Sequence, residues 1–239
     1  MAALLEFFFW CHDWSIAFLG KHLFTLKRLI LVTAHLALFG FFFPDLRKDF
    51  GEMARNLLVV ILFLSPFSKI LRMRLLLQSM SLRRELGIAM AYLATVHGLG
   101  YLLDPEWFAL LVTPALSISL WRVDPGLLAG AATYLLTLPL LFTSNDFAQR
   151  RLGHYWKKLH RIVYAVFVFS LLHGYFMKGS SQGELFQAIS LLLFYLLLKV
   201  LAWHNFLPPL QRLIDLVALQ YREYTDRLKN TPPGGKMPV

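Results

Sequence analysis

The sequence predicts an all-α integral membrane protein whose core is a bundle of six transmembrane helices. Of its 239 residues, 57% are hydrophobic and only 16% are charged, whereas a soluble domain carries roughly 25% charged residues. The mean hydropathy is +0.56. Long apolar runs alternate with short basic clusters, which is typical of a chain that crosses a bilayer several times.

Six apolar runs are candidates for these helices. A helix that crosses the hydrocarbon core needs about 20 residues, and about 17 are still sufficient. The first run has only 15 residues, so it spans the core only if Lys27 and Arg28 extend their side chains to the interface and the helix begins earlier. In the fourth run, Gly126 and Gly130 have a spacing that allows close approach of a neighbouring helix. The predicted spans are 29–43, 52–71, 86–103, 126–142, 159–177 and 185–203.

The basic residues predict the orientation of the bundle. Nineteen of the 24 lysines and arginines fall on one side of the predicted topology, together with both ends of the chain. Because basic loops stay in the cytoplasm, we expect cytoplasmic N- and C-termini. The net charge of +10 is then a topology signal, and we expect no nucleic-acid partner. The basic residues on the opposite side are Arg47, Lys48, Arg55, Arg122 and Lys178.

The same pattern divides the chain into three regions. Residues 1–28 are aromatic and apolar but lack the basic start of a signal peptide, so we interpret them as an interfacial segment. Residues 29–203 form the predicted transmembrane domain. Residues 204–239 are predicted to form a cytoplasmic amphipathic helix, beginning after Pro208 and Pro209, and a disordered tail.

Histidines inside the apolar runs are the main functional signal. An ionisable side chain at membrane depth is costly and normally faces the bundle interior, where it has a partner. His97 lies about 16 Å along the third span and His173 about 21 Å along the fifth, so their depths are comparable. This pair suggests a haem held between the third and fifth helices by two axial imidazoles. Alternatively, each histidine forms a structural hydrogen bond between helices.

The roles of several other polar residues, in the predicted spans and at their ends, are ambiguous. His160 lies in a basic segment, 13 residues before His173 and on another face of the helix, so a wetted interfacial residue is the simpler interpretation. His35 could pair with His160, bind a quinol or form a structural hydrogen bond. Four arginines are interpreted first as topology determinants, although arginine also suits a haem propionate or a flavin phosphate. They are Arg83, Arg84, Arg150 and Arg151.

Several other cofactor chemistries are excluded by the sequence. The single cysteine, Cys11, permits neither an intramolecular disulfide nor a cysteine-ligated cluster, and no C-x-x-C-H motif is present for covalent haem attachment. The segment from His204 onward is too short for a dinucleotide-binding domain. A redox protein of this kind therefore takes its electrons from a separate protein or from a membrane quinol.

Several short segments together carry a family resemblance. They are 64–67 (LSPF), 83–87 (RRELG), 94–97 (ATVH), 142–144 (FTS), 149–153 (QRRLG), 159–160 (LH) and 163–164 (VY), with His173 thirteen residues after His160. In these segments the chain resembles the MsrQ (YedZ) family of ferric reductase-like transmembrane haem proteins. The resemblance covers roughly residues 28–203 and is most specific around His160.

The resemblance implies a b-type haem protein of the bacterial inner membrane. Family members carry electrons from a cytoplasmic flavin reductase or a quinol to a periplasmic molybdopterin-dependent methionine sulfoxide reductase, and FMN is a further cofactor of the family. By position, His97, His160 and His173 match the family's haem-associated histidines. Larger relatives have a second histidine fourteen residues before the position of His97, where this chain has Arg83. One haem, between His97 and His173, is therefore the safer expectation, with two as the alternative.

The predicted function is thus that of an electron-transfer subunit in an oxidoreductase system, with the substrate chemistry left to a partner. Two alternatives stay open at this point. One is a stand-alone ferric or small-acceptor reductase that uses the same haem. The other is a haem-free membrane assembly factor or transporter, in which the histidines are structural.

Overall fold

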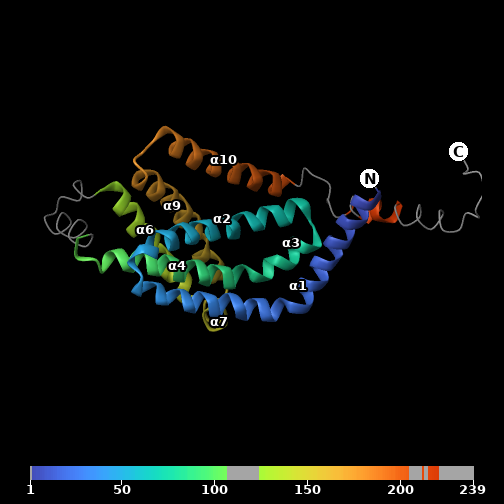
Figure 1. Cartoon of the computed structure of the whole chain (residues 1–239), viewed down its shortest axis with the longest axis horizontal. Helices are drawn as coiled ribbons and strands as arrows, with labels where there is room; N and C mark the ends of the chain where they lie inside the picture. The colour runs from blue at the N-terminus through green and yellow to red at the C-terminus, as the bar shows by residue number, and fades with distance from the viewer. Residues whose placement is uncertain (1, 107–123, 205–211, 213–214, 221–239) are drawn as a thin grey trace, which may run out of the picture.

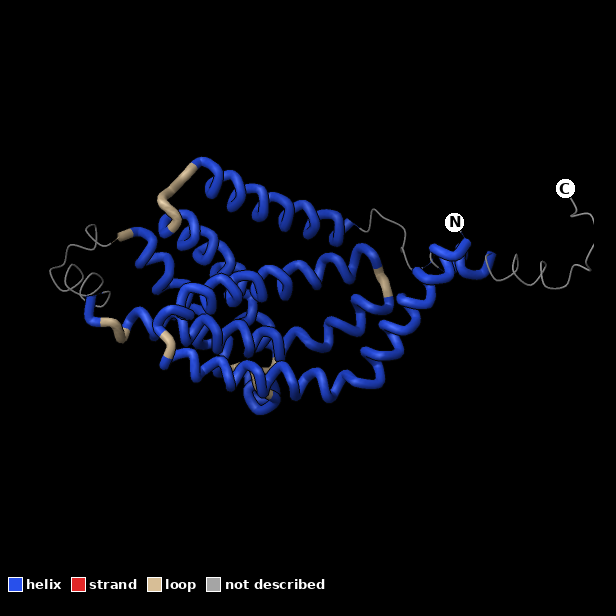
Figure 2. Tube along the Cα trace, in the orientation of Figure 1, coloured by secondary structure: helices blue, strands red, loops and turns tan. Residues whose placement is uncertain are grey.

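The computed structural model is helical throughout the residues that it describes, which are 2–106, 124–204, 212 and 215–220, and these residues contain no strand (Figures 1 and 2). The α-helices include α1 (Ala2–Ala37), α2 (Arg47–Leu71), α3 (Arg74–Ser79), α4 (Arg83–Leu102), α6 (Pro125–Phe142), α7 (Asp146–Leu152), α8 (His154–Leu159), α9 (Val163–Met177) and α10 (Gln182–His204). Short 3-10 helices connect several of them: η1 (Leu38–Phe42), η2 (Pro44–Leu46), η3 (Met80–Leu82) and η5 (His160–Ile162).

Five helical segments among the described residues are long and apolar enough to cross a membrane. They correspond to the first, second, fourth, fifth and sixth predicted spans. The predicted third span lies in α4, which is less apolar because Glu85 and His97 interrupt it. The five segments are Trp10–Phe42, Pro44–Leu71, Pro125–Phe142, His154–Met177 and Gln182–His204.

The first helix differs from the sequence prediction in length. We predicted a short span over 29–43 after a separate interfacial segment, whereas α1 runs without interruption from Ala2 to Ala37. Stacked rings follow one face of it, with Trp10 on Trp14 and Trp14 on Phe18 at centroid distances of 6.3 and 5.0 Å. These contacts between successive turns favour continuation of the helix. Figure 1 shows that α1 bends near α3, so its N-terminal part slants away from the bundle.

The bundle is organised around two closely packed helix pairs, α2 with α4 and α6 with α9. In addition, α1 packs on α4, and α10 packs on α2 and α9. The most deeply buried apolar side chains lie on the paired helices and include Leu58, Leu62, Val96, Val166 and Phe167. The outer helix α10 exposes large apolar side chains, such as Trp203 at 82%, as expected for a surface that faces lipid.

Local sequence signals account for the ends of several helices. Asp124 caps α6 by accepting hydrogen bonds from the backbone N–H groups of Gly126 and Leu127, with Pro125 at the first helical position. Asn145 caps α7 in the same way through the N–H of Ala148. Most of the segment between α4 and α6, and most of the predicted amphipathic helix and tail after His204, lie outside the described residues.

Candidate functional site

The structure brings His97 and His173 together. His97 comes from α4 and His173 from α9, and their ring centroids are 5.9 Å apart with an interplanar angle of 70°. The two residues are 76 positions apart in the chain, so only the packing of the two helix pairs makes them neighbours. The Tyr101 ring also lies beside His97, at a centroid distance of 5.1 Å and an interplanar angle of 76°.

Both histidines make the same hydrogen bond with a neighbouring helix. His97 Nδ1 donates to the backbone carbonyl of Arg47 at 2.8 Å, and His173 Nδ1 donates to that of Gly126 at 2.8 Å. Because a carbonyl oxygen can only accept, Nδ1 carries the proton in both rings. The lone pair of each neutral imidazole is therefore on Nε2, which is the arrangement of a metal-ligating histidine.

The geometry fits a metal-centred group held by two imidazoles. A metal–nitrogen bond is about 2 Å and half an imidazole ring adds about 1 Å, so rings on opposite sides of one ion have centroids about 6 Å apart. The observed 5.9 Å matches this separation. The described residues contain no group of three or more His, Cys, Asp or Glu side chains that could hold a bare metal ion. A donor set of two imidazoles therefore suits a haem, whose macrocycle supplies the other ligands of the iron.

His160 lies apart from this pair and has a different hydrogen-bond pattern. Thr143 Oγ1 donates to the carbonyl of Pro139 at 2.6 Å and lies 3.1 Å from His160 Nε2. With its proton used in this way, the hydroxyl accepts from Nε2, so the lone pair of the His160 ring is on Nδ1. Trp156 stacks on the ring at a centroid distance of 4.0 Å and donates its Nε1–H to the carbonyl of Thr143. The proposed ligand role of His160 stays a prediction.

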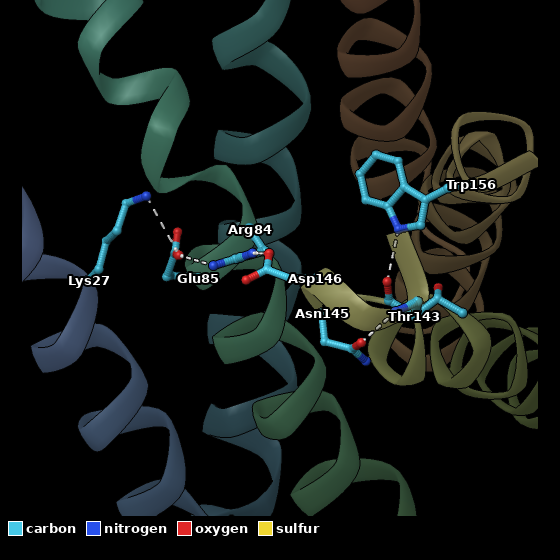
Figure 3. A network of polar contacts seen from close by, with 8 residues as sticks. Lys27, Arg84, Glu85, Thr143, Asn145, Asp146 and Trp156 are labelled. Atoms are coloured by element: carbon cyan, nitrogen blue, oxygen red, sulfur yellow. Dashed lines mark hydrogen bonds and ion pairs between the residues drawn. The ribbon is translucent and has the colours of Figure 1, made fainter. Parts of the chain in front are cut away.

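Two of the predicted arginines, Arg83 and Arg84, begin α4. Figure 3 shows Arg84 between Glu85 and Asp146: it forms an ion pair with Asp146 at the start of α7 and a second one, at 3.4 Å, with Glu85. Glu85 also pairs with Lys27 of α1 at 3.8 Å. Arg84 therefore has a structural role in joining α4 to α7, while Glu85 joins α4 to α1. The role predicted for Arg83 toward a cofactor is untested.

The other two, Arg150 and Arg151, are exposed in the last turn of α7. Basic side chains at this position interact favourably with the C-terminal end of the helix dipole. His35 is also accounted for locally, since its Nδ1 donates to the Leu31 carbonyl and its Nε2 lies 3.3 Å from the Tyr92 hydroxyl. Of the three interpretations of His35, the structural hydrogen bond matches these contacts.

Sequence reasoning missed two contributors to these sites. Arg47 was counted only as an outer charge, yet its backbone carbonyl orients His97, while its side chain forms an ion pair with Asp104 at 3.3 Å. Because every residue has a carbonyl, this role leaves no signal in the sequence. Glu85 is the second: it is a buried carboxylate at the start of α4. Its position in the sequence, directly after two arginines and before an apolar run, could have indicated a buried carboxylate with cationic partners.

Comparison with known proteins connects this site to a family. The family described as "Ferric reductase like transmembrane component" matches residues 50–171, which include His97 and His160 and end just before His173. No solved structure matches the chain.

Several relatives carry the name "Protein-methionine-sulfoxide reductase heme-binding subunit MsrQ". The protein from Pectobacterium atrosepticum is 30% identical over 193 residues, which are 74% of this chain and 92% of that relative. The one from Azospira oryzae is 36% identical over 130 residues, 54% of this chain and 52% of its own length. The one from Cronobacter sakazakii is 32% identical over 142 residues, 56% of this chain and 66% of its own.

Proposed function

The chain belongs to the MsrQ family of ferric reductase-like transmembrane proteins, and from this membership we propose that it is a haem-binding membrane subunit that transfers electrons to a methionine sulfoxide reductase. The observation that carries the proposal is the pair formed by His97 and His173. Both rings have Nδ1 bound to a backbone carbonyl and Nε2 left for a ligand. Two helices far apart in the chain thus bring two imidazoles with the same tautomer to a centroid distance of 5.9 Å.

His97 and His173 would hold one haem b between α4 and α9. When bound, the haem would supply a one-electron carrier held by these two side chains. The side chains of the chain bind and orient this group, and the apolar helices around it exclude water. A second haem that uses His160 is not required by this proposal.

We propose that α4, which contains the predicted third span, also crosses the membrane and brings the number of spans to six. Its 20 residues extend about 30 Å, which is the thickness of the hydrocarbon core. It packs on α1, α2 and α6, so much of its surface meets protein rather than lipid, and such a surface can accommodate Glu85 and His97. With six spans, the excess of basic residues on one side supports cytoplasmic N- and C-termini. The bacterial inner membrane is the location that we propose for a member of this family.

The direction of transfer follows from this topology. His97 and His173 lie toward the periplasmic side, where the acceptor would be a molybdopterin-dependent methionine sulfoxide reductase. A cytoplasmic flavin reductase or a membrane quinol would be the donor. If FMN takes part, Arg83, Arg84, Arg150 and Arg151 are the cationic residues on the cytoplasmic side that suit its phosphate.

A difference spectrum of the detergent-purified protein tests the proposal. We expect dithionite-reduced minus oxidised absorption typical of b-type haem, and we expect this signal to be lost in both His97→Ala and His173→Ala. His35→Ala is the matched control, because it removes a histidine whose ring nitrogens have other partners. A flat spectrum from folded wild-type protein supplied with haem would contradict the proposal, as would retention of the signal in both ligand variants.

A further inference from the structure

The two helices that accept hydrogen bonds from the histidines share a second feature. On α2, Gly51 lies four residues after Arg47, whose carbonyl accepts from His97. On α6, Gly130 lies four residues after Gly126, whose carbonyl accepts from His173. Residues four apart lie on one face of a helix, so each glycine is directly beside the ring that its helix orients.

The contact between each glycine and its ring is too close for any side chain. A Cβ built on Gly51 would lie 2.5 Å from Nδ1 and 2.7 Å from Cε1 of His97. A Cβ built on Gly130 would lie 2.8 Å from Nδ1 and 2.9 Å from Cε1 of His173. These separations are well inside van der Waals contact, so a methyl group would force either the ring or the helix to move.

We propose that Gly51 and Gly130 are positioning residues for haem ligation, each forming with the carbonyl one turn before it a cradle that fixes the imidazole of the opposite helix. We call these the α2 cradle (Arg47 carbonyl and Gly51) and the α6 cradle (Gly126 carbonyl and Gly130). The glycine lets the ring approach the backbone closely enough for its Nδ1–H to reach the carbonyl. The carbonyl then selects the tautomer and turns Nε2 toward the haem. This inference rests on the proposed function.

The two cradles explain why the site is nearly symmetric. Among the described helices, the α2–α4 and α6–α9 pairs pack most extensively. Each pair contains the same arrangement of a carbonyl, a glycine and a histidine. The spacing of Gly126 and Gly130 is therefore more than a general device for helix packing. Gly126 supplies the acceptor atom, and Gly130 supplies the space.

An alanine at either glycine would displace the ring from its carbonyl. Nδ1 would lose its acceptor, the tautomer would no longer be fixed, and Nε2 would point away from its ligating direction. Loss of a partner that orients a ligating histidine typically lowers affinity by about 10- to 100-fold. We expect that loss of haem affinity in Gly51→Ala and in Gly130→Ala, with a changed low-spin spectrum and a shifted midpoint potential for the haem that remains.

Two glycines of α4, Gly87 and Gly98, provide control variants. A Cβ on Gly87 would meet nothing within 4 Å, so Gly87→Ala should behave as wild type. A Cβ on Gly98 would lie 3.1 Å from the Tyr134 ring, whose atoms are its nearest neighbours outside the adjacent residues, so Gly98→Ala adds steric pressure between α4 and α6. If Gly51→Ala and Gly130→Ala bind haem as wild type does, or if Gly98→Ala loses as much haem as they do, the inference is wrong.

A double-mutant cycle separates ring positioning from helix packing and stays informative if the single variants fold poorly. In His97→Gly protein supplied with imidazole, the free ligand is not tethered to α4 and can move away from an added methyl group. We expect Gly51→Ala to cause little further loss of haem in that background. An equal loss in both backgrounds would overturn the inference.

The proposed function and this inference fail in distinguishable ways. A wild-type protein without haem contradicts both. A wild-type protein with haem, together with alanine variants that keep its affinity and spectrum, contradicts the cradles alone.

Discussion

The carboxylate of Glu85 on α4 pairs with Lys27 of α1 and with Arg84 of its own helix, and its removal gives the sharpest stability prediction. Its side chain is 2% exposed, and its Oε1 lies 3.8 Å from Lys27 Nζ and 3.4 Å from an Arg84 guanidinium nitrogen. Glu85→Ala would leave two cations without this partner. Breaking a fully buried ion pair costs about 3–5 kcal/mol.

Here the cost is smaller, because the cations are less buried than the carboxylate. The side chains of Lys27 and Arg84 are 29% and 42% exposed, and Arg84 keeps Asp146 as a partner. We therefore assign about 1 kcal/mol to each lost contact, the upper part of the range for exposed pairs, or about 2 kcal/mol together. For a chain of this size, that corresponds to a fall in Tm of about 4–8 °C.

Thermal unfolding of the purified protein in one detergent, at one scan rate, measures this fall. Glu85→Gln keeps the shape and one acceptor oxygen but loses the charge, so its Tm should lie between those of Glu85→Ala and wild type. The haem spectrum should not change, because Glu85 is 12 residues, or about 18 Å, from His97 along α4. A Tm of Glu85→Ala within 1 °C of wild type, on the order of the measurement error, would refute the assigned energy.

Two further predictions concern the cytoplasmic end and the topology. Thr143→Val removes the hydroxyl that accepts from His160 Nε2, so we expect a loss of about 1 kcal/mol, seen as a Tm lower by about 2–4 °C, with the haem spectrum of the main site unchanged. Loss of that spectrum in the Thr143 variant would contradict this expectation and would indicate that His160 contributes to haem binding. In a Cys11→Ser background, Lys178→Cys should react with a membrane-impermeant thiol reagent applied from the periplasmic side, whereas Arg150→Cys should react only after lysis. The reverse labelling pattern would contradict the proposed orientation.

Much of the architecture could be predicted from the sequence, because the signals involved are local. Apolar run length predicted five spans that the structure matches, since the bilayer thickness sets the length of a helix that must satisfy its own backbone hydrogen bonds. The comparable depths of His97 and His173 followed from the predicted orientation of the two helices and from helix rise, and the structure places their ring centroids 5.9 Å apart. The length of α1 was predicted poorly, because charged residues near 21–28 resembled a boundary, whereas Lys27 is paired with Glu85 inside the packed structure.

By itself, the sequence determined an apolar helical protein with histidines inside two of its helices. Only the tertiary structure decided which atoms those histidines contact. The Arg47 and Gly126 carbonyls have no sequence signature, because every residue carries the same acceptor, and only the register between packed helices selects one. The same register gives Gly51 and Gly130 their roles, since space beside a ring depends on how closely two helices approach. Hydrophobicity places a helix in the membrane, but packing decides the rotation and depth at which it meets its neighbour.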